Sequence, residues 1–399
     1  MTWLAVASVW ILAVVALPLG LAVCVFVAQV AMAARTGLPA IARTKARHAR
    51  SRLVVLVPAH DEAGGIARTI ACVLPQLHPA DRILVVADNC SDDTAAVARQ
   101  AGAMVVERFH DTERGKGFAL AFGIDALRSD PPGIVVILDA DCDLAPHALD
   151  ALVDAVVATE RPAQALYLML APADASLPRR LAQFAWRVRN WVRPAGWHRL
   201  GLPCQLMGTG MAFSWPMLRE APLANASIVE DMKLGIALGV GGRPPVFCAQ
   251  ALVTSTFPST AAATNTQRTR WEHGHLEMIL REAPAMVRRA VARGDARLLG
   301  MALDLAVPPL ALLAGLLSID WLLALGAGLL GAGPGIVLAA SALLAGFLLA
   351  VLGAWIVRGR DLVRFTELLS VPWYIAAKLP VYVRFIVRRQ RAWVRTDRK

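Results

Sequence analysis

Two long apolar segments constrain the fold of this chain more than any other feature. Apolar residues are concentrated in Trp3–Ala34 and Leu303–Val357, and Trp3–Met32 contains no charged residue. A helix needs about 20 apolar residues to cross a bilayer, and each segment exceeds that length. Trp3–Met32 is also far longer than the roughly 7–15 apolar residues of a signal peptide, so we expect a retained anchor over residues 1–34. The sequence therefore predicts an integral membrane protein with a soluble middle.

The second apolar segment is interrupted by Gly331–Gly335, a turn-forming run without charge. It predicts two membrane helices, over Leu305–Leu330 and Ile336–Val357, and a break at Asp320 would shift the first of them. We expect Leu362–Ile386 to be interfacial or partly re-entrant rather than a third full span, because two prolines and a lysine interrupt it.

Basic residues border the apolar segments. Residues 35–51 form a basic linker, and the tail Arg388–Lys399 is basic as well. The positive-inside rule places both in the cytoplasm with the soluble domain between them, and we expect a bacterial inner (plasma) membrane. The net charge of +11 then fits anionic lipid headgroups better than nucleic acid, for which no motif is visible. The six cysteines show neither a C-x-x-C pair nor zinc spacing, which indicates free thiols in a reducing compartment.

The soluble middle alternates predicted strands with predicted helices. The strands are short apolar runs, and each is followed by a polar turn and a helical segment. The expected strands are Leu53–Val57, Ile83–Ala87, Ala103–Glu107 and Ile134–Leu138. This alternation predicts an α/β fold with a parallel, doubly wound, nucleotide-binding half. No dinucleotide or P-loop fingerprint is present.

Two carboxylates follow the last of these strands, at Asp139 and Asp141. Open α/β sheets bind their ligands beyond the carboxyl ends of the strands. Two oxygens so placed suit a hard divalent cation that also holds a substrate phosphate, as Mg²⁺ does. The alternative is that both residues merely cap the next helix.

Six short motifs occur in a fixed order along the middle of the chain. They are Pro58-Ala59-His60-Asp61-Glu62, Asp88, Gly115-Lys116-Gly117, Asp139-Ala140-Asp141, Val229-Glu230-Asp231 and Gln267-Arg268-Thr269-Arg270-Trp271. Together they resemble the inverting family 2 glycosyltransferases with the GT-A fold, in the membrane-bound branch that carries a Q-x-x-R-W motif. The resemblance covers roughly Arg52–Leu276, and the flanking apolar segments agree with it. One departure is His60-Asp61, where the family often has an asparagine before the glutamate.

The resemblance implies a donor site for a nucleoside diphosphate sugar, with uridine as the expected nucleoside. Pro58, Glu62 and Asp88 would contact the base, and Lys116 would lie near the diphosphate. Of the D-x-D pair, Asp139 would face the donor sugar and also contact the metal, while Asp141 would be the main ligand of a divalent ion, Mg or Mn. Such an ion neutralises charge on a departing diphosphate.

The resemblance also implies a base and a binding helix. Asp231, beside Glu230, would take the proton from the acceptor hydroxyl, although acidic residues also favour any helix N-terminus. Gln267, Arg270 and Trp271 lie at i, i+3 and i+4, on one helical face. They offer an amide, a guanidinium fork for diphosphate and an indole platform, while an interfacial helix facing lipid headgroups would use the same residues.

The sequence leaves two alternatives for the acceptor of the sugar. One version makes a β-linked exopolysaccharide, to which the Q-x-x-R-W motif leans, and another makes a glycolipid, as ceramide glucosyltransferases do. Three spans make a sparse channel for a polymer unless a homo-oligomer or an export partner completes it. Leu177–Arg193, basic with two tryptophans, is expected to lie on the membrane or to bind the acceptor. Gly208-Thr209-Gly210 resembles a loop near the acceptor, or is a plain turn.

An alternative from a different functional class is a non-catalytic membrane subunit that senses a nucleotide. The acidic and basic residues of the motifs argue against this alternative. The expected organisation has an anchor, a linker, a glycosyltransferase domain, two spans and an interfacial tail. Their ranges are 1–34, 35–51, 52–295, 296–358 and 359–399.

Overall fold

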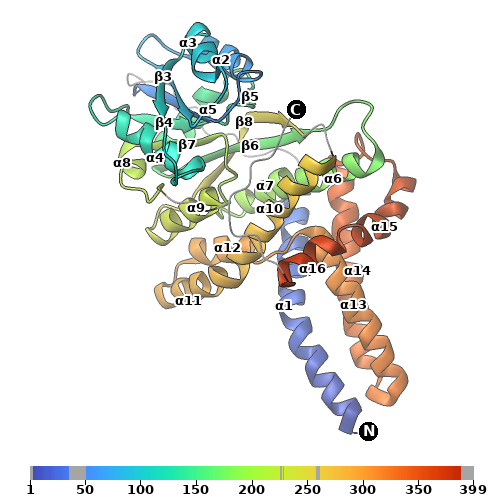
Figure 1. Ribbon diagram of the computed structural model, residues 1–399. Coiled ribbons are helices and arrows are strands. Elements are labelled where there is room, and N and C mark those ends of the chain that lie inside the picture. The colour runs from blue at the N-terminus through green and yellow to red at the C-terminus, as the bar shows by residue number, and fades with distance from the viewer. Residues whose placement is uncertain (1–2, 36–50, 225–226, 228, 258–260, 388–399) are drawn as a thin grey trace.

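The computed structural model describes residues 3–35, 51–224, 227, 229–257 and 261–387. An α/β domain lies above three long helices that extend away from it (Figure 1). By length and composition these helices suffice to cross a membrane, over Leu12–Ala33, Leu310–Ala332 and Pro334–Arg358. They are called the candidate spans below. The basic linker at 36–50 and the tail Arg388–Lys399 lie outside the described residues.

The predicted parallel half of the sheet is confirmed. Its strands are β1 (Leu53–Ala59), β2 (Arg82–Asp88), β3 (Met104–Arg108) and β4 (Ile134–Ile137). Strand β1 pairs in parallel with both β2 and β4, and β2 pairs in parallel with β3. The connecting helices are α2 (Ile66–Val73), extended by a 3₁₀ turn to Gln76, α3 (Thr94–Gln100) and α4 (Lys116–Ala126). The right-handed crossovers expected of such units place the carboxyl ends of the strands along one edge.

Four further strands complete an eight-stranded sheet of order β3-β2-β1-β4-β7-β6-β8-β5. They are β5 (Asp143–Leu144), β6 (Ala163–Leu170), β7 (Met211–Ser214) and β8 (Val246–Thr256). Strand β7 runs antiparallel between β4 and β6, while β6 and β8 are parallel. The sheet is therefore mixed, which the sequence analysis did not foresee.

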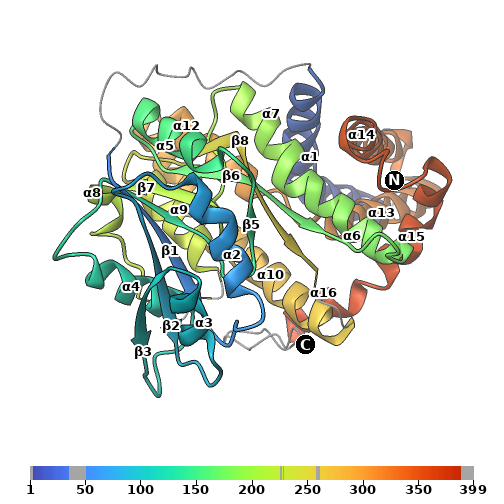
Figure 2. The ribbon, with the colours of Figure 1, turned by 90° about the horizontal axis from the view of Figure 1, so that it is seen from above.

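Both faces of β1 are buried, which explains its unbroken apolar run. Val55 and Val57 pack into one core with α2 and α5 (Ala148–Thr159). Val54 and Leu56 pack into the other core with α4 and β7. A strand buried on both faces has no need of polar alternation. Figure 2 shows the sheet from above, with helices over both of its faces.

The remaining helices connect the sheet to the candidate spans. They are α6 (Leu177–Arg187), α7 (Arg193–Arg199), α8 (Trp215–Leu218), α9 (Glu230–Val240), α10 (Ala261–Arg281), α11 (Ala283–Arg293) and α12 (Ala296–Leu305). A π-helical segment, Val188–Val192, joins α6 to α7. Pro194 follows at once, and because it lacks an N–H it removes one helical hydrogen bond at this junction.

The candidate spans are α1 (Trp3–Ala34), α13 (Leu310–Ala327) and α14 (Pro334–Arg358). The expectation that the second span starts at Leu305 is wrong, because α12 ends there and Pro308-Pro309 separates it from α13. Helix α13 continues through Asp320 without a break, and the expected turn lies at Gly331–Gly333. After α14 the chain forms a 3₁₀ turn, Phe365–Ser370, and the short helices α15 (Val371–Ala376) and α16 (Leu379–Val387).

Candidate active site

The turn after β4 presents Asp139 and Asp141 at the carboxyl edge of the sheet. Two neighbouring elements hold its backbone. The Thr69 hydroxyl of α2 donates to the Ala140 carbonyl at 2.8 Å, and the Asp139 N–H donates to the Thr209 hydroxyl at 3.0 Å. The turn is thus fixed from both sides, and both carboxylates remain half-buried rather than closed off.

Lys116, the first residue of α4, lies against this turn. Its ammonium group donates to the Asp139 carboxylate and, at 2.7 Å, to the Gly208 carbonyl. Burial alone would lower the pKa of Lys116, but the charges of Asp139, Glu230 and Asp231 raise its pKa overall. The lysine therefore stays protonated among three carboxylates.

Glu230 and Asp231 begin α9 and lie near the same lysine. A methyl group added at Gly208 would lie 3.4 Å from the Asp231 carboxylate and 3.8 Å from the Lys116 ammonium. Gly208, Asp231 and Lys116 are therefore close neighbours. Burial, and then the charge of Asp231, raises the pKa of Glu230 to about 7. Burial also raises the pKa of Asp231, although Lys116 opposes this. A buried carboxylate with a raised pKa is a stronger base than one in water.

The loop Gly208-Thr209-Gly210 lies beside the Lys116 ammonium and the Asp231 carboxylate. Gly208 has φ +91° and Gly210 has φ +65°, conformations that favour glycine. A Cβ at Gly210 would meet Ala165 and Val253 side chains at 2.8 Å, so the loop packs directly on the sheet. Gln164 fixes it further by donating to the Thr209 carbonyl at 2.9 Å. The loop thus accepts from the Asp139 N–H through Thr209 and lies beside the Asp231 carboxylate at Gly208, so it adjoins both acidic motifs.

The residues around the D-x-D turn fit a hard divalent ion. Side-chain atoms of Asp139, Asp141 and Cys142 lie within 4.8 Å of one another. Burial, followed by the charge of Asp141, keeps the pKa of the Cys142 thiol well above its usual value, so the sulfur stays protonated. A neutral thiol is a poor ligand, whereas two carboxylates suit Mg²⁺ or Mn²⁺. The fitting ligands are therefore Asp139 and Asp141.

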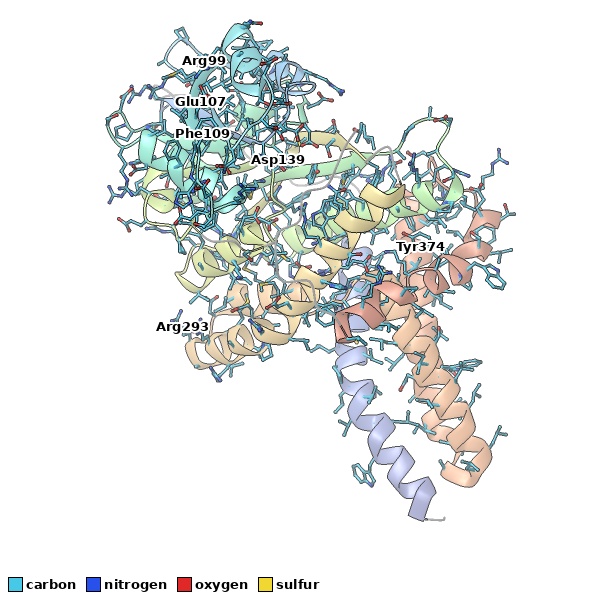
Figure 3. The ribbon with its side chains drawn as sticks, viewed as in Figure 1. Arg99, Glu107, Phe109, Asp139, Arg293 and Tyr374 are labelled. Carbon is cyan, nitrogen blue, oxygen red and sulfur yellow. The ribbon has the colours of Figure 1, made fainter. Side chains whose placement is uncertain are left out.

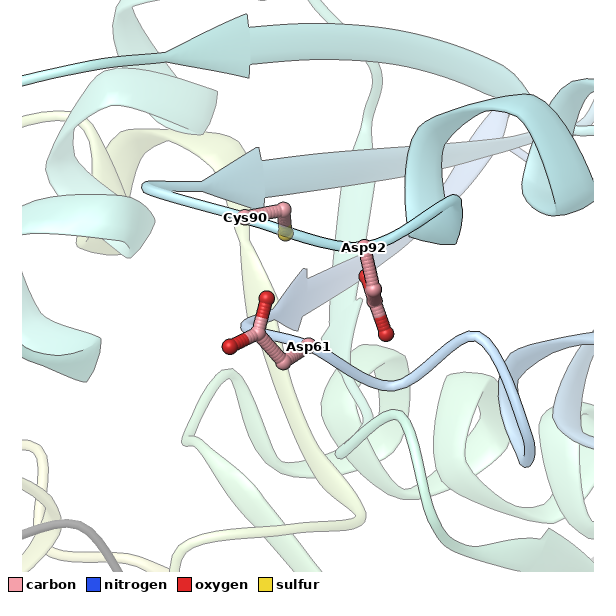
Figure 4. A group of neighbouring side chains, drawn as sticks. All are labelled: Asp61, Cys90 and Asp92. Atoms are coloured by element: carbon pink, nitrogen blue, oxygen red, sulfur yellow. The ribbon is translucent and has the colours of Figure 1, made fainter.

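A second acidic group, Asp61, Cys90 and Asp92, joins the loops that follow β1 and β2 (Figure 4). Its carboxylates are used by backbone groups. Asp61 accepts from the Ser91 N–H at 2.6 Å, and Asp92 accepts from the Ala63 N–H at 3.1 Å. Burial raises the pKa of the Cys90 thiol. These contacts fasten one loop to the other and offer a structural reason for the cluster.

Three residues were expected to contact the base of the nucleotide. They are Pro58, Glu62 and Asp88, and they lie at the ends of β1 and β2. Pro58 is within β1, and the Glu62 N–H donates to the Thr94 hydroxyl at 2.8 Å. The Asp88 carboxylate is buried and accepts from Arg108 at 2.8 Å. Sequence reasoning missed Arg108, although its place at the end of β3, next to β2, is a signal for such a pair.

Gln267, Arg270 and Trp271 lie on the helix α10, and Trp271 packs against the core cluster that includes Ala140 and Cys142 of the D-x-D turn. Gln267 is buried, and the Trp271 ring packs on Trp186 with centroids 4.9 Å apart. Gln267 and Trp271 line one large cavity together, whereas Arg270 is not among its lining residues. The next residue, Glu272, accepts from Lys378 at 2.6 Å.

Two histidines that follow the motif have structural partners. His273 contacts the Val381 carbonyl at 2.9 Å through its Nε2, and His275 contacts that of Leu305 at 3.1 Å. Burial holds the pKa of His275 well below its usual value, so this ring is neutral. Both rings tie α10 to neighbouring segments.

Comparisons with known proteins point to one family. A family model described as "Glycosyltransferase like family 2" matches residues 50–274. The "probable glycosyltransferase YdaM" of Bacillus subtilis (strain 168) is 24% identical over 240 residues, which cover 58% of this chain and 56% of that protein. The chain therefore matches little more than half the length of this relative.

One solved structure shows the same architecture. The mannosyltransferase PcManGT from Pyrobaculum calidifontis, in complex with GDP-Man and Mn²⁺, aligns with a TM-score of 0.52 at 17% identity and covers 94% of this chain and 100% of that chain. Glucosyl-3-phosphoglycerate synthase from Mycobacterium tuberculosis, with Mg²⁺ and UDP, aligns at a TM-score of 0.39 and 21% identity, covering 60% of this chain and 84% of that one. The family match and the mannosyltransferase structure together confirm the expected GT-A fold.

Proposed function

The chain belongs to the family 2 glycosyltransferases, and from this premise we propose that it moves a hexose from a nucleoside diphosphate sugar to a membrane-associated acceptor with inversion. The observation that carries the proposal is the position of Lys116. Its ammonium group contacts Asp139 and the Gly208 carbonyl, and it lies beside the Asp231 carboxylate. Groups suited to a diphosphate and a group suited to a proton transfer thus meet at one place.

On the donor side, Lys116 would compensate phosphate charge, while Pro58, Glu62 and Asp88 would hold the base at the ends of β1 and β2. Asp141, with Asp139, would hold a divalent cation. When bound, such a cation neutralises charge on the departing nucleoside diphosphate. We expect Arg270 to contribute a guanidinium fork to the diphosphate, and Gln267 and Trp271 to shape the site from α10.

On the acceptor side, Asp231 would take the hydroxyl proton as the oxygen attacks the anomeric carbon. Its raised pKa makes it a better base, and a positioned base contributes roughly 10²–10⁴-fold to the rate. Inversion in one displacement requires no covalent intermediate, so no second nucleophilic carboxylate is required. Glu230, with a pKa of about 7, would share the charge of the pair at neutral pH.

We also propose that the candidate spans lie in a bacterial inner membrane with the catalytic domain in the cytoplasm, because basic residues border them. The nucleoside is proposed as uridine on the motif resemblance. PcManGT binds GDP-Man, so guanosine donors belong in the same test. The acceptor is either a growing polysaccharide or a lipid.

The test is a donor screen of the full chain in nanodiscs. UDP- and GDP-sugars are supplied with Mg²⁺ or Mn²⁺, and both nucleoside diphosphate release and labelled product are measured. We expect one donor to be used, and Asp141→Ala and excess chelator each to reduce turnover at least about 10²-fold, because leaving-group charge goes uncompensated. Asp125→Ala, at an exposed carboxylate of α4, is the control and should behave as wild type.

Transfer from none of these donors would contradict the proposed function. Full activity in excess chelator would contradict only the metal assignment.

A further inference from the structure

We propose that the acceptor is a membrane lipid, whose apolar chain lies in a cavity between α6, α13, α14 and α15 and whose hydroxyl-bearing headgroup reaches Asp231. This inference rests on the proposed function, because it names the substrate of the same site. It chooses between the two acceptors that the sequence left open.

The cavity has a volume of about 770 Å³, which is within the 300–1,000 Å³ typical of small-molecule sites. Apolar side chains from several elements form most of its wall, among them Leu181 of α6, Phe347 of α14 and Ile375 of α15. Ion pairs hold this wall together, since Arg180 of α6 binds Glu367 at 2.6 Å and Arg187 binds Asp361 at 2.7 Å. A built cavity with such a lining suits a hydrocarbon chain.

One end of the cavity is polar and belongs to the catalytic domain. Gln267 and Trp271 of the motif line it, with Arg189 and the Glu272–Lys378 pair. Trp271 packs on Trp186 with the two ring planes tilted by 43°, which gives this end an aromatic wall. Indole rings suit the boundary between an apolar chain and a wet headgroup.

Arg189 connects this polar end to the candidate base. It also lines a smaller cavity of about 30 Å³ whose wall includes Met207 and Met232, the sequence neighbours of Gly208 and Asp231. The positive charge of Arg189 also opposes the rise in the pKa of Asp231. The polar end therefore adjoins the region of Asp231, where the acceptor hydroxyl must lie.

The apolar end extends along the candidate spans. The α14 residues that line the cavity run from Leu344 to Val351. At 1.5 Å per residue the cavity thus follows α14 for about 10 Å, compared with about 15 Å for one leaflet of a hydrocarbon core about 30 Å thick. This length suits part of a lipid tail in the leaflet next to the catalytic domain. Figure 3 shows Asp139 in that domain and Tyr374, which lines the cavity, where the long helices meet it.

A growing polysaccharide fits this cavity poorly. Its hydroxyl groups would lose water beside Phe347, Leu348 and Val351, which offer them no hydrogen bonds. A lipid places only its headgroup at the polar end. Its hydroxyl oxygen then bonds to the anomeric carbon, the bond from that carbon to the diphosphate oxygen breaks, and the hydroxyl proton passes to Asp231.

Two glycines of α13 provide a matched test. Gly315 lines the cavity, and a Cβ there would meet only Ile375, at 3.9 Å, so Gly315→Leu would fill space without a backbone clash. A Cβ at Gly326 meets nothing within 4 Å, and Gly326 does not line the cavity. Gly326→Leu therefore makes the same chemical change on the same helix and serves as the control.

The experiment reconstitutes the full chain in vesicles of bacterial total lipid extract with its labelled donor. Label extracted into chloroform–methanol is separated from label in aqueous polymer. We expect organic-phase product from wild type, at least about tenfold less from Gly315→Leu, and wild-type levels from Gly326→Leu. Ser318→Leu, at a second lining position, should reproduce the loss, and nucleoside diphosphate binding should be unchanged in all variants and shows that they are folded.

Label found only in aqueous polymer would overturn the lipid acceptor while leaving the proposed function intact. Organic-phase product that Gly315→Leu and Ser318→Leu leave unchanged would make the cavity a seat for structural lipid only, and would overturn the proposal as well. No transfer from any donor would instead contradict the proposed function itself.

Discussion

Lys116 controls the electrostatics of the candidate site. Asp139, Glu230 and Asp231 all act on its pKa, so three carboxylates share one ammonium group. If all were ionised, three negative charges would face one positive charge. Burial, together with this excess of negative charge, explains why the pKa of Glu230 rises to about 7, and the excess charge explains why a cation suits the site.

The raised pKa of Glu230 predicts a specific pH dependence of stability. The carboxyl ionises near its usual 4.5 in the unfolded chain and near 7 in the folded protein. Between these values the folded state binds more protons, so this contribution is complete below pH 4.5 and is lost as the pH rises to about 7. We expect the Tm of Glu230→Gln to fall less than that of wild type over this range, in thermal scans of the metal-free protein.

Glu220→Gln is the matched control, because Glu220 is exposed. Its Tm should follow wild type at every pH. If Glu230→Gln keeps the full pH dependence of wild type, another group is responsible for it.

At the scale of elements, the anchor helix α1 is joined to the domain by close packing and a buried polar network. Gln29 of α1 donates to Asp304 of α12 at 2.7 Å and accepts from Arg193 of α7 at 2.9 Å, and Arg193 binds Asp304 at 2.9 Å. Gly196 of α7 faces the Gln29 backbone, where an added Cβ would lie 1.9 Å from the carbonyl oxygen. The two helices can approach this closely only because residue 196 is glycine.

Gly196→Ala should therefore destabilise the protein. No side-chain rotation relieves a clash with backbone, so α7 must move from α1 at a cost of about 1–3 kcal/mol, typical of overpacking. Thermal unfolding of the detergent-solubilised full chain should show a lower Tm. Gly326→Ala, which adds the same methyl group to a helix in open space, should not lower it, and equal Tm values for both variants would contradict this packing.

Some helices and strands can be predicted from their own local sequence, and others cannot. Runs such as Leu53–Val57 are buried on both faces and bounded by turns, so local pattern suffices for the parallel half. Strand β7 has four residues and exists through antiparallel pairing with β4, which a local pattern does not encode. The start of α13 was misplaced because hydropathy alone does not register how Pro308-Pro309 ends a helix.

In the candidate site too, some features can be predicted from local sequence and others depend on the tertiary fold. The D-x-D turn and Glu230-Asp231 are recognisable as motifs, but their common neighbour Lys116 is set by the tertiary fold. Arg108 was missed, because its pairing with Asp88 requires the register of β2 and β3.

At the scale of the whole molecule, the candidate site at the carboxyl edge of the sheet lies above a cavity that the candidate spans help to line. Residues from Leu181 to Leu379 line that cavity, so its walls include residues of seven α-helices, from α6 to α16. No sequence window contains it, so the sequence alone leaves the acceptor undecided between lipid and polymer. The lipid acceptor is our proposal, and the apolar lining described above supports it.

The central claim is that Asp231 is the base of a sugar transfer and that donor binding depends on other residues. Asp231→Asn keeps the shape of the side chain but cannot accept the proton. We expect its affinity for nucleoside diphosphate, measured by calorimetry, to equal that of wild type, and its turnover at saturating donor to fall at least about 10²-fold. Near-normal turnover with lost nucleotide affinity would make Asp231 a binding residue and contradict the mechanism.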